Sequence, residues 1–394
     1  MRKVYDVTNY GAKPSNEDNK DAFLAAWSAA CGSAAGNATL LIPNGTFVVG
    51  TVKFRGPCES GGAPAVVIDG VLQPPGGVSN DDAWITFAGV NNLLVTGAGT
   101  LDGQGGDGTD DDYCYQRKPI TTTLKLEGVT NTVVRGLRLV NSRGFHVNFH
   151  RSSRHAGGGL HIQAPATSRN TDGVHVGLSD HVTISNTSVA TGDDCVSLGP
   201  GSTDVVVSGV TCSPGHGISI GSLGKAAGEA DVRGVVVKNC TVSATTNGLR
   251  VKTWPGSPPS RAYNITFQDI AMADVNNPII VDQHYCPHGQ CSDIAKISDV
   301  RYERISGTSS SREAVRLLCS ESRPCSRVRL DQINLSCGQT PCGAQMSNVQ
   351  GMHTSMGHAP SPSPSPAPAA IVHLEQEADD EESSTEQIRG VMLL

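Results

Sequence analysis

A short repeat places chemically reactive side chains at matching positions of this chain. Its apolar tetrads follow one another at offsets of 22 residues and occupy residues 173–176, 195–198 and 217–220. Asp172, Asp194 and His216 each stand directly before a tetrad. A period of this length is typical of a solenoid, in which corresponding residues of successive coils lie side by side. We therefore predict that these three side chains form a ladder, with about 4.8 Å between coils.

A second series of short segments accompanies these tetrads. The segments are rich in β-branched residues, are bounded by Gly, Asn or Asp, and occupy residues 182–185, 205–208, 235–238 and 265–268. This composition predicts strands. Two or three strands per coil, joined by tight corners, favour a parallel β-helix, an all-β fold, over a sandwich of two sheets. The predicted fold is a single-stranded, right-handed parallel β-helix.

Both ends of the chain depart from the repeat. Residues 21–30 carry Phe23, Trp27 and Ala30 on one helical face, which predicts a short helix that caps the open end of the solenoid. Beyond about residue 350, proline alternates with Ser and Ala, and an acidic segment follows. We expect a catalytic β-helix domain over residues 1–350 and a disordered tail over residues 351–394.

The charge of the chain is concentrated in its tail. The net charge is −7, and residues 360–394 hold seven acids against the single base Arg389. The remaining residues are close to neutral, so an acidic substrate would meet little overall repulsion. No segment is apolar over the length that spans a membrane. We expect neither a nucleic-acid nor a membrane partner, and a monomeric protein.

The cysteine content points to an oxidising compartment. Twelve cysteines are present, and short spacings predict three disulfides, Cys286–Cys291, Cys319–Cys325 and Cys337–Cys342. The CxxC spacing of a zinc site does not occur. Six N-x-S/T sequons are compatible with secretion and occur at Asn37, Asn44, Asn186, Asn239, Asn264 and Asn334. We predict a secreted protein, although the first residues lack the apolar stretch of a signal peptide.

The acidic residues of the repeat indicate a type of chemistry. Asp172, Asp193 and Asp194 would lie within a few ångströms of one another, and such a cluster raises the pKa of at least one member. An acid beside one or two bases is the equipment of glycoside hydrolysis. Arg250 and Lys252 lie two residues apart on the following coil and therefore share a face. They would suit the carboxylate of a uronate sugar.

Four peptides carry a family resemblance. They stand in this order in the chain: Asn170-Thr171-Asp172, Gly192-Asp193-Asp194, Gly215-His216-Gly217 and Arg250-Val251-Lys252. Over residues 5–325 the chain resembles the polygalacturonases, pectin-degrading enzymes of glycoside hydrolase family 28, and especially the exopolygalacturonases of plant pollen. The resemblance implies hydrolysis of α-1,4-galacturonosidic bonds in pectin. It also implies exo action with release of galacturonate, in the plant cell wall.

The resemblance assigns roles that the repeat alone leaves open, because the repeat cannot choose the acid among three carboxylates. By resemblance, Asp193 is the general acid, Asp172 and Asp194 activate water, and the anomeric carbon is inverted. His216 positions the acid. The implied substrate-binding residues are Asn170, Arg250, Lys252 and Tyr285. Neither a metal nor an organic cofactor is implied.

The sequence departs from the family pattern at three places. Val251 stands where isoleucine is more common, and we expect little effect. Arg169 replaces the usual proline before Asn170, which relaxes the turn and adds a base near the cleft. Residues 150–159 replace a cysteine-containing strand of the repeat. We expect the coil there to be irregular, with a modest effect on activity.

Other interpretations remain open at this stage. A calcium-dependent lyase with an arginine base, a non-catalytic pectin-binding protein and an endo-acting hydrolase would share much of this sequence. Histidines 146, 150, 155 and 161 match no metal-ligand spacing, and we interpret them as surface or cleft residues. Asp107, Asp110, Asp111 and Asp112 lack the order of a calcium loop, so we interpret them as a solvated loop.

Overall fold

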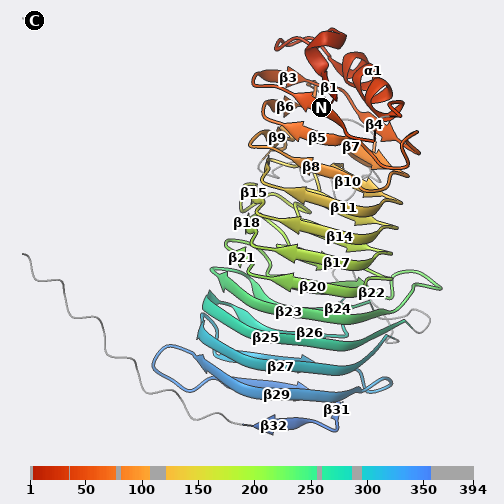
Figure 1. The fold of residues 1–394 in the computed structure, drawn as a ribbon. Coiled ribbons are helices and arrows are strands. Elements are labelled where there is room, and N and C mark those ends of the chain that lie inside the picture. Colours follow the sequence, from red (N-terminus) through yellow and green to blue (C-terminus); the bar gives the residue numbers. More distant parts are fainter. Residues whose placement is uncertain are drawn as a thin grey trace, which may run out of the picture. The chain divides into compact units, whose positions relative to one another are not determined.

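The strands of this chain stack in parallel, coil upon coil. The computed structural model describes residues 3–34, 36–76, 81–106, 121–254, 260–285 and 295–355. All strand pairings of the repeat region are parallel and mostly in register, which confirms the predicted parallel β-helix (Figure 1). The predicted strands at 182–185, 205–208, 235–238 and 265–268 are all present.

Two sheets run along the stack within the described residues. The smaller sheet has 11 strands in simple chain order. They are β4 (Val52–Arg55), β7 (Ala83–Ala88), β10 (Thr122–Glu127), β13 (Val147–His150), β16 (Val174–Gly177), β19 (Val196–Leu198), β22 (Ile218–Leu223), β24 (Asn247–Thr253), β26 (Asn277–Asp282), β28 (Glu313–Leu318) and β30 (Gly343–Ser347).

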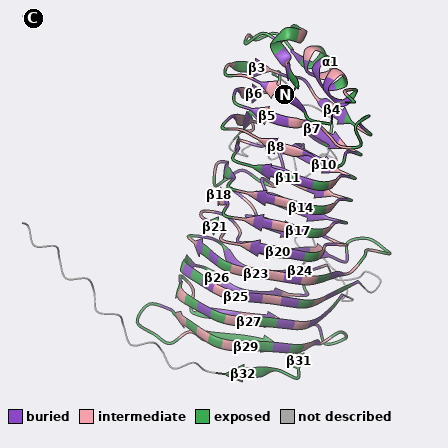
Figure 2. Ribbon diagram, viewed as in Figure 1, coloured by how far each residue is buried: buried purple, intermediate pink, exposed green. Residues whose placement is uncertain are grey.

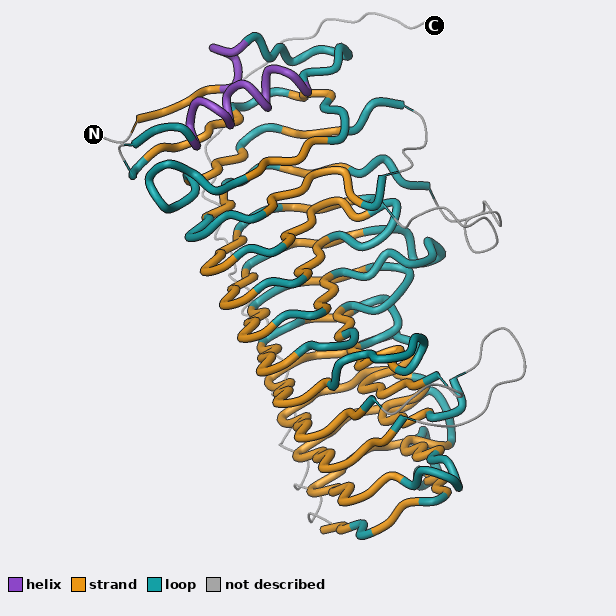
Figure 3. Tube along the Cα trace, turned by 90° about the vertical axis from the view of Figure 1, so that its right-hand side faces the viewer, coloured by secondary structure: helices purple, strands orange, loops and turns teal. Residues whose placement is uncertain are grey.

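The larger sheet has 21 strands. They are β1 (Lys3–Asp6), β2 (Ala38–Ile42), β3 (Thr46–Val48), β5 (Ala65–Ile68), β6 (Val71–Gln73), β8 (Leu94–Thr96), β9 (Thr100–Asp102), β11 (Thr130–Arg135), β12 (Arg138–Val140), β14 (Ser153–Gly158), β15 (His161–Gln163), β17 (Asp180–Ser185), β18 (Ser188–Ala190), β20 (Thr203–Ser208), β21 (Thr211–Cys212), β23 (Val232–Ser243), β25 (Arg261–Val275), β27 (Lys296–Ser309), β29 (Cys325–Ser336), β31 (Val349–Gln350) and β32 (His353–Ser355). Figure 3 shows these strands stacked along the coil axis.

The core consists of aliphatic columns that run from coil to coil. One column of the 11-stranded sheet follows the strand register and comprises Leu124, Val147, Val174, Val196, Ile218, Leu249, Ile279 and Val315. All of these side chains are buried. Figure 2 shows buried residues recurring along the stacked strands. Because strand residues alternate between faces, the intervening positions of the same strands point out of the coil. The apolar tetrads thus fix the register that aligns the polar residues beside them.

The N-terminal end is covered as predicted. Helix α1 (Lys20–Cys31) buries Phe23 and Trp27, and a 3-10 turn, η1 (Val7–Tyr10), precedes it. Trp27 packs 5.1 Å from the ring of Phe54, and its indole Nε1 donates to the carbonyl of Arg55 at 3.0 Å. The helix therefore shields apolar side chains of the first coils from water.

Corners of the 21-stranded sheet depend on two columns of left-handed residues. The first column has φ values between +51° and +68° and comprises Asn92, Asn131, Arg154, His181, Asp204, Gly234, Asn264, Asp299 and Arg327. The second comprises Gly136, Gly159, Asn186, Gly209, Asn239, Asp269, Arg304 and Gln332. Gly, Asn and Asp tolerate this conformation best, which explains why they recur at the strand boundaries of the sequence.

The segment 150–159 does not disturb the coil, so the expected irregularity is wrong. Strand β14 pairs with β11 and β17 without a register shift. His155 and Gly157 point into the core, at positions where the next coil has Val182 and Ile184. The ring of Phe149 stacks on His155 at 5.2 Å and lies beside Gly157. A larger aromatic side chain therefore fills the space that the glycine leaves.

Four disulfides occur among the described residues. Cys319–Cys325 and Cys337–Cys342 are those predicted, whereas Cys31–Cys58 and Cys195–Cys212 are additional. The predicted pair Cys286–Cys291 and the tail beyond residue 355 lie outside the described residues, as do Asp107 to Asp112. Cys240 is a free, buried thiol. Among the described segments, no helix has the length and apolar character needed to cross a membrane.

Candidate active site

The predicted ladder lies along the 11-stranded sheet. Asp172, Asp194 and His216 stand two residues before Val174, Val196 and Ile218, which are register partners on β16, β19 and β22. Backbone hydrogen bonds continue this register through the preceding turns, since the amide of Gly173 donates to the carbonyl of Asp194 at 2.9 Å. The three predicted residues therefore occupy matching positions of consecutive coils.

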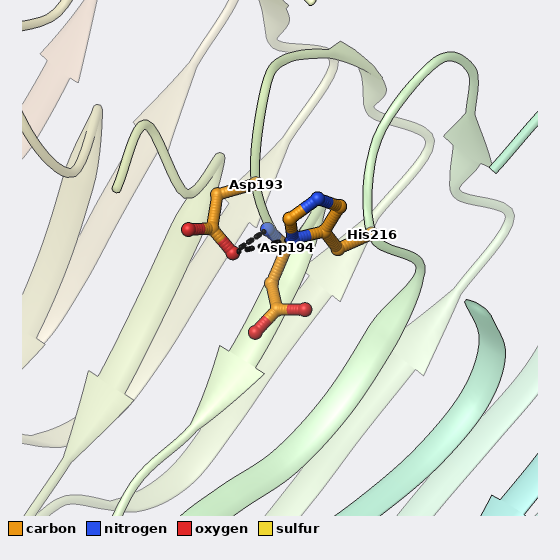
Figure 4. A group of neighbouring side chains, drawn as sticks. All are labelled: Asp193, Asp194 and His216. Atoms are coloured by element: carbon orange, nitrogen blue, oxygen red, sulfur yellow. Dashed lines mark hydrogen bonds and ion pairs between the residues drawn. The ribbon is translucent and has the colours of Figure 1, made fainter. Parts of the chain in front are cut away.

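Asp193 is held between two neighbouring turns. Its Oδ1 atom lies 3.1 Å from Nδ1 of His216 and accepts a hydrogen bond from the backbone amide of Asp194 at 2.8 Å (Figure 4). The backbone amide of Asn170, a residue in the left-handed conformation, donates to Oδ2 at 3.1 Å. The side chain of Asp193 is 17% exposed, so a ligand at the surface can reach it.

Asp194 is buried and surrounded by donors. Its Oδ1 atom lies 2.6 Å from Nη2 of Arg250, and its Oδ2 atom lies 2.9 Å from Nζ of Lys252. The hydroxyl of Ser219 donates to Oδ1 at 2.6 Å. Burial disfavours the charged form of Asp194, but the two cations and the hydroxyl outweigh it and lower the pKa to about 2. Asp194 is therefore ionised under ordinary conditions.

Asp172 has the opposite electrostatic environment. Burial, followed by the negative charges of Asp193 and Asp194, raises the pKa of Asp172 well above its usual range. The hydroxyl of Ser197 contacts its Oδ2 atom at 2.5 Å. The cluster thus combines one carboxylate that stays charged with one carboxyl group that retains a proton more readily, as expected for coupled acids.

Three polar residues that support this cluster were not predicted from the sequence. His175, Ser197 and Ser219 are register neighbours on the outer face of the 11-stranded sheet, followed by Arg250. Each is the third residue of an apolar tetrad. Strand alternation places that position on the face opposite the core, so the tetrads contained the signal.

Arg250 and Lys252 share a face, as predicted, but in this structure both contact Asp194. Tyr285 lies beside them, with Nζ of Lys252 5.3 Å from its ring centroid. Trp254 packs edge-on against Tyr285 at 5.4 Å, and Nζ of Lys225 lies 5.7 Å from the Trp254 ring. These aromatic and cationic groups form a rim that continues the carboxylate cluster toward later coils.

The structure provides one cluster of possible metal-ligating groups among the described residues. Ligand atoms of Asp193, Asp194 and His216 lie within 4.8 Å of one another. Both oxygens of Asp194 already contact cationic side chains, and a metal ion would have to displace them. The interpretation of the four histidines as surface or cleft residues is wrong for His146 and His155, which are buried.

Parallel coils that present a cluster of carboxyl groups match the arrangement expected of a glycoside hydrolase built on a β-helix. The sequence model of the glycosyl hydrolases family 28 matches residues 31–357, and the chain belongs to that family. The chain is 45% identical over 342 residues to an exopolygalacturonase of Platanus acerifolia, covering 84% of this chain and 90% of the relative. It is 42% identical to the exopolygalacturonase of Oenothera organensis, covering 81% of this chain and 90% of that protein.

Solved structures agree on the fold. An exopolygalacturonase from Thermotoga maritima superposes with a TM-score of 0.71 at 17% identity, covering 90% of this chain and 92% of that chain. The polygalacturonase of Erwinia carotovora gives a TM-score of 0.71 at 22% identity, covering 89% and 96%. At these identities the likeness establishes the shared β-helix.

Proposed function

We propose that this protein hydrolyses α-1,4-galacturonosidic bonds of polygalacturonate and releases galacturonate from a chain end. The observation that supports this most directly is the position of Asp193. Its side chain is partly exposed, lies next to the buried Asp194 and is hydrogen-bonded to His216. The plant relatives at 45% and 42% identity are exopolygalacturonases, which favours exo over endo action. The resemblance in sequence supports inversion at the anomeric carbon.

The proposed roles follow from charge and access. Asp194 stays ionised beside Arg250 and Lys252, so it cannot donate the proton that the leaving oxygen needs. Asp193 is the carboxyl group that a glycosidic oxygen can approach, and we assign it as the general acid, positioned by His216. Asp172 and Asp194 orient and deprotonate the attacking water.

The proposed substrate is an anionic polysaccharide. A uronate carboxylate could share the guanidinium of Arg250 and the ammonium of Lys252 with Asp194, because both groups have donors beyond the contacts made here. Tyr285 would offer its ring face to a sugar. Asn170 would border the same subsite, since its backbone already fixes Asp193.

We further propose that the protein works as a monomer outside the cell, in a plant wall. The four disulfides among the described residues require an oxidising compartment for their formation. The plant exopolygalacturonases that the chain resembles support the same setting.

The test is incubation of the disulfide-intact protein with polygalacturonate in the presence of a calcium chelator. Reducing ends, unsaturated products and product sizes are followed together, and proton NMR records the anomer first released. Galacturonate released as the inverted anomer without unsaturation is the expected result. Mixed oligomers would replace exo by endo action, and unsaturated products that require calcium would identify a lyase.

The Asp193→Asn variant tests the acid directly. It keeps the shape of the side chain and removes the proton, so turnover should fall by roughly 10²–10⁴-fold while polymer binding persists. Asp231→Asn, which alters an ion pair with the exposed Arg261, is the control and should leave turnover unchanged. Normal turnover by Asp193→Asn would contradict the assignment.

A further inference from the structure

A chain of hydrogen bonds leads away from Asp172 along the outer face of the 11-stranded sheet. The Ser197 hydroxyl oxygen lies 2.5 Å from Asp172 Oδ2 and 2.8 Å from Nδ1 of His175. His175 and Ser197 are register partners on β16 and β19. Asp172 and Ser197 are buried, whereas His175 is partly exposed. The three groups therefore connect a buried carboxyl group to a side chain at the surface of the sheet.

The imidazole of His175 is held in a defined orientation. Its ring stacks on Phe145 with 4.5 Å between centroids and 18° between planes. A Cβ atom added at Gly199 would lie 3.2 Å from Cε1 of the ring, and one added at Gly177 would lie 3.4 Å from Nε2. Gly177, at the end of β16, and Gly199, just after β19, thus leave the space that the ring occupies.

Burial and the neighbouring charges favour the neutral form of the His175 imidazole. Burial, followed by the nearby His150 and Lys252, lowers the pKa of His175 to about 4, although Asp194 acts in the opposite direction. Asp193, Asp194 and Lys252 are the charged groups that face Asp172. A neutral imidazole carries its proton on Nδ1 or on Nε2, and the hydrogen-bond partner of Nδ1 determines which.

The Ser197 hydroxyl can take either of two orientations between Asp172 and His175, because it donates one hydrogen bond and can accept others. If Asp172 is ionised, Ser197 donates to Asp172 and Nδ1–H of His175 donates to Ser197. If Asp172 is protonated, its O–H donates to Ser197, Ser197 donates to Nδ1, and the imidazole proton is on Nε2. Each direction satisfies all three groups.

We propose that Ser197 and His175 form a proton relay that returns Asp172 to its ionised form in each catalytic cycle. After Asp172 has taken a proton from water, the imidazole exchanges its Nδ1 proton for a proton on Nε2 through solvent, and Ser197 turns toward Nδ1. The proton of Asp172 then passes to the Ser197 oxygen, the hydrogen of Ser197 passes to Nδ1, and His175 releases its Nε2 proton to solvent. One proton has entered at Asp172 and one has left at Nε2, and the arrangement with an ionised Asp172 and Nδ1–H is restored. This role rests on the proposed hydrolase function, in which Asp172 serves as a base.

The first test does not require activity. Protein labelled with ¹⁵N-histidine is titrated, and the His175 signals are assigned by their loss in the His175→Asn variant. The relay predicts Nδ1–H at pH values above the titration of Asp172 and Nε2–H below it. A single tautomer on both sides of that titration would overturn the proposal, whether or not the protein degrades polygalacturonate.

The second test separates proton transfer from positioning. Asparagine at residue 175 can place an amide nitrogen near the position of Nδ1 but cannot pass a proton through a ring. We expect kcat on polygalacturonate to fall on the order of 10-fold or more in His175→Asn and in Ser197→Ala, with KM little changed. Ser197→Thr, which keeps the hydroxyl, should retain most of kcat.

A matched control is Asn148→Ala, which alters the register neighbour of His175 on the opposite side, in β13. It should leave kcat, KM and the pH profile unchanged. An unchanged kcat and pH profile in His175→Asn would show that the imidazole only holds Ser197, and this result would overturn the relay. Absence of hydrolysis in the unaltered protein would instead contradict the proposed function and leave the NMR test to decide the relay.

Discussion

Asp194 and His155 are buried to a similar degree but differ in their partners. They are 1% and 3% exposed, respectively. Asp194 contacts Arg250, Lys252 and Ser219, whereas both ring nitrogens of His155 lack a hydrogen-bond partner. Asp194 remains charged with a pKa of about 2, whereas burial outweighs the charge of Asp180, lowers the pKa of His155 to about 4 and keeps the imidazole neutral. Burial sets the cost of a charge, and the partners decide whether the charge persists.

The face of the strand explains this difference. Asp194 precedes β19. The outer positions of the neighbouring strands in later coils carry polar residues, including Arg250. His155 points into the core between Thr132 and Val182, on strands whose inner positions are mainly aliphatic. Cations can therefore approach the carboxylate, whereas the mainly aliphatic side chains around the imidazole cannot stabilise its charged form.

Removing the charge of Asp194 should have the largest effect. In Asp194→Asn, Arg250 and Lys252 lose a buried counterion, so we expect about 3–5 kcal/mol lower stability. Turnover should fall on the order of 10³-fold, because the water-binding pair loses its permanent charge. Thermal unfolding and reducing-end assays measure the two effects.

The control for this variant is Asp269→Asn, which alters the exposed pair with Arg304. Exposed ion pairs contribute about 1 kcal/mol or less, so this variant should stay close to the unaltered protein. If the two variants lose equal stability, burial does not strengthen the ion pairs of Asp194, and the expectation is wrong.

His155 should make the protein sensitive to acid. Its pKa is about 4 in the folded chain and about 6.5 in the unfolded chain, so between these values the unfolded chain binds more protons. Stability from this group is fully present above about pH 6.5 and decreases as the pH falls toward 4, by roughly 3 kcal/mol at most. His155→Leu should remove that decrease.

Unfolding transitions at pH 7.5 and pH 4.5 test this expectation, because contributions from His146 and His175 are common to both proteins and cancel in the comparison. His161→Leu, at an exposed position on β15, is the matched control and should not change the pH dependence. A variant at residue 155 that loses as much stability in acid as the unaltered protein would refute the account.

The substitution Gly157→Ala should have the smallest effect on stability. A Cβ atom there would lie 3.7 Å from Phe149, an ordinary contact, so Gly157→Ala should stabilise the protein by about 0.5–1 kcal/mol. At Gly192, a Cβ atom would lie 2.0 Å from the carbonyl oxygen of Ser168, and alanine should be strongly destabilising. Melting temperatures compare the two variants, and similar shifts would contradict the packing described for β14.

The sequence predicted the fold and the position of the carboxylates because both depend on a regular period. Asp172 and Asp194 could be aligned through the tetrads beside them. The sequence did not reveal that Arg250 contacts Asp194, because residues 56 positions apart meet only through the stacking of the coils. It also missed the inward direction of His155, because the run of small residues 156–159 lacks the apolar alternation that marks a face.

The left-handed corner residues also influence how glycosylation sites should be interpreted. Three exposed sequon asparagines, Asn186, Asn239 and Asn264, belong to these columns. The residue after each points inward and the Ser or Thr that follows points outward, so the β-helix itself produces the N-x-S/T spacing. A glycan there would stand on the 21-stranded sheet, whereas the carboxylates precede strands of the 11-stranded sheet. Exchanging such an asparagine for glycine would remove the carbohydrate and preserve the corner, whereas a β-branched replacement would remove both.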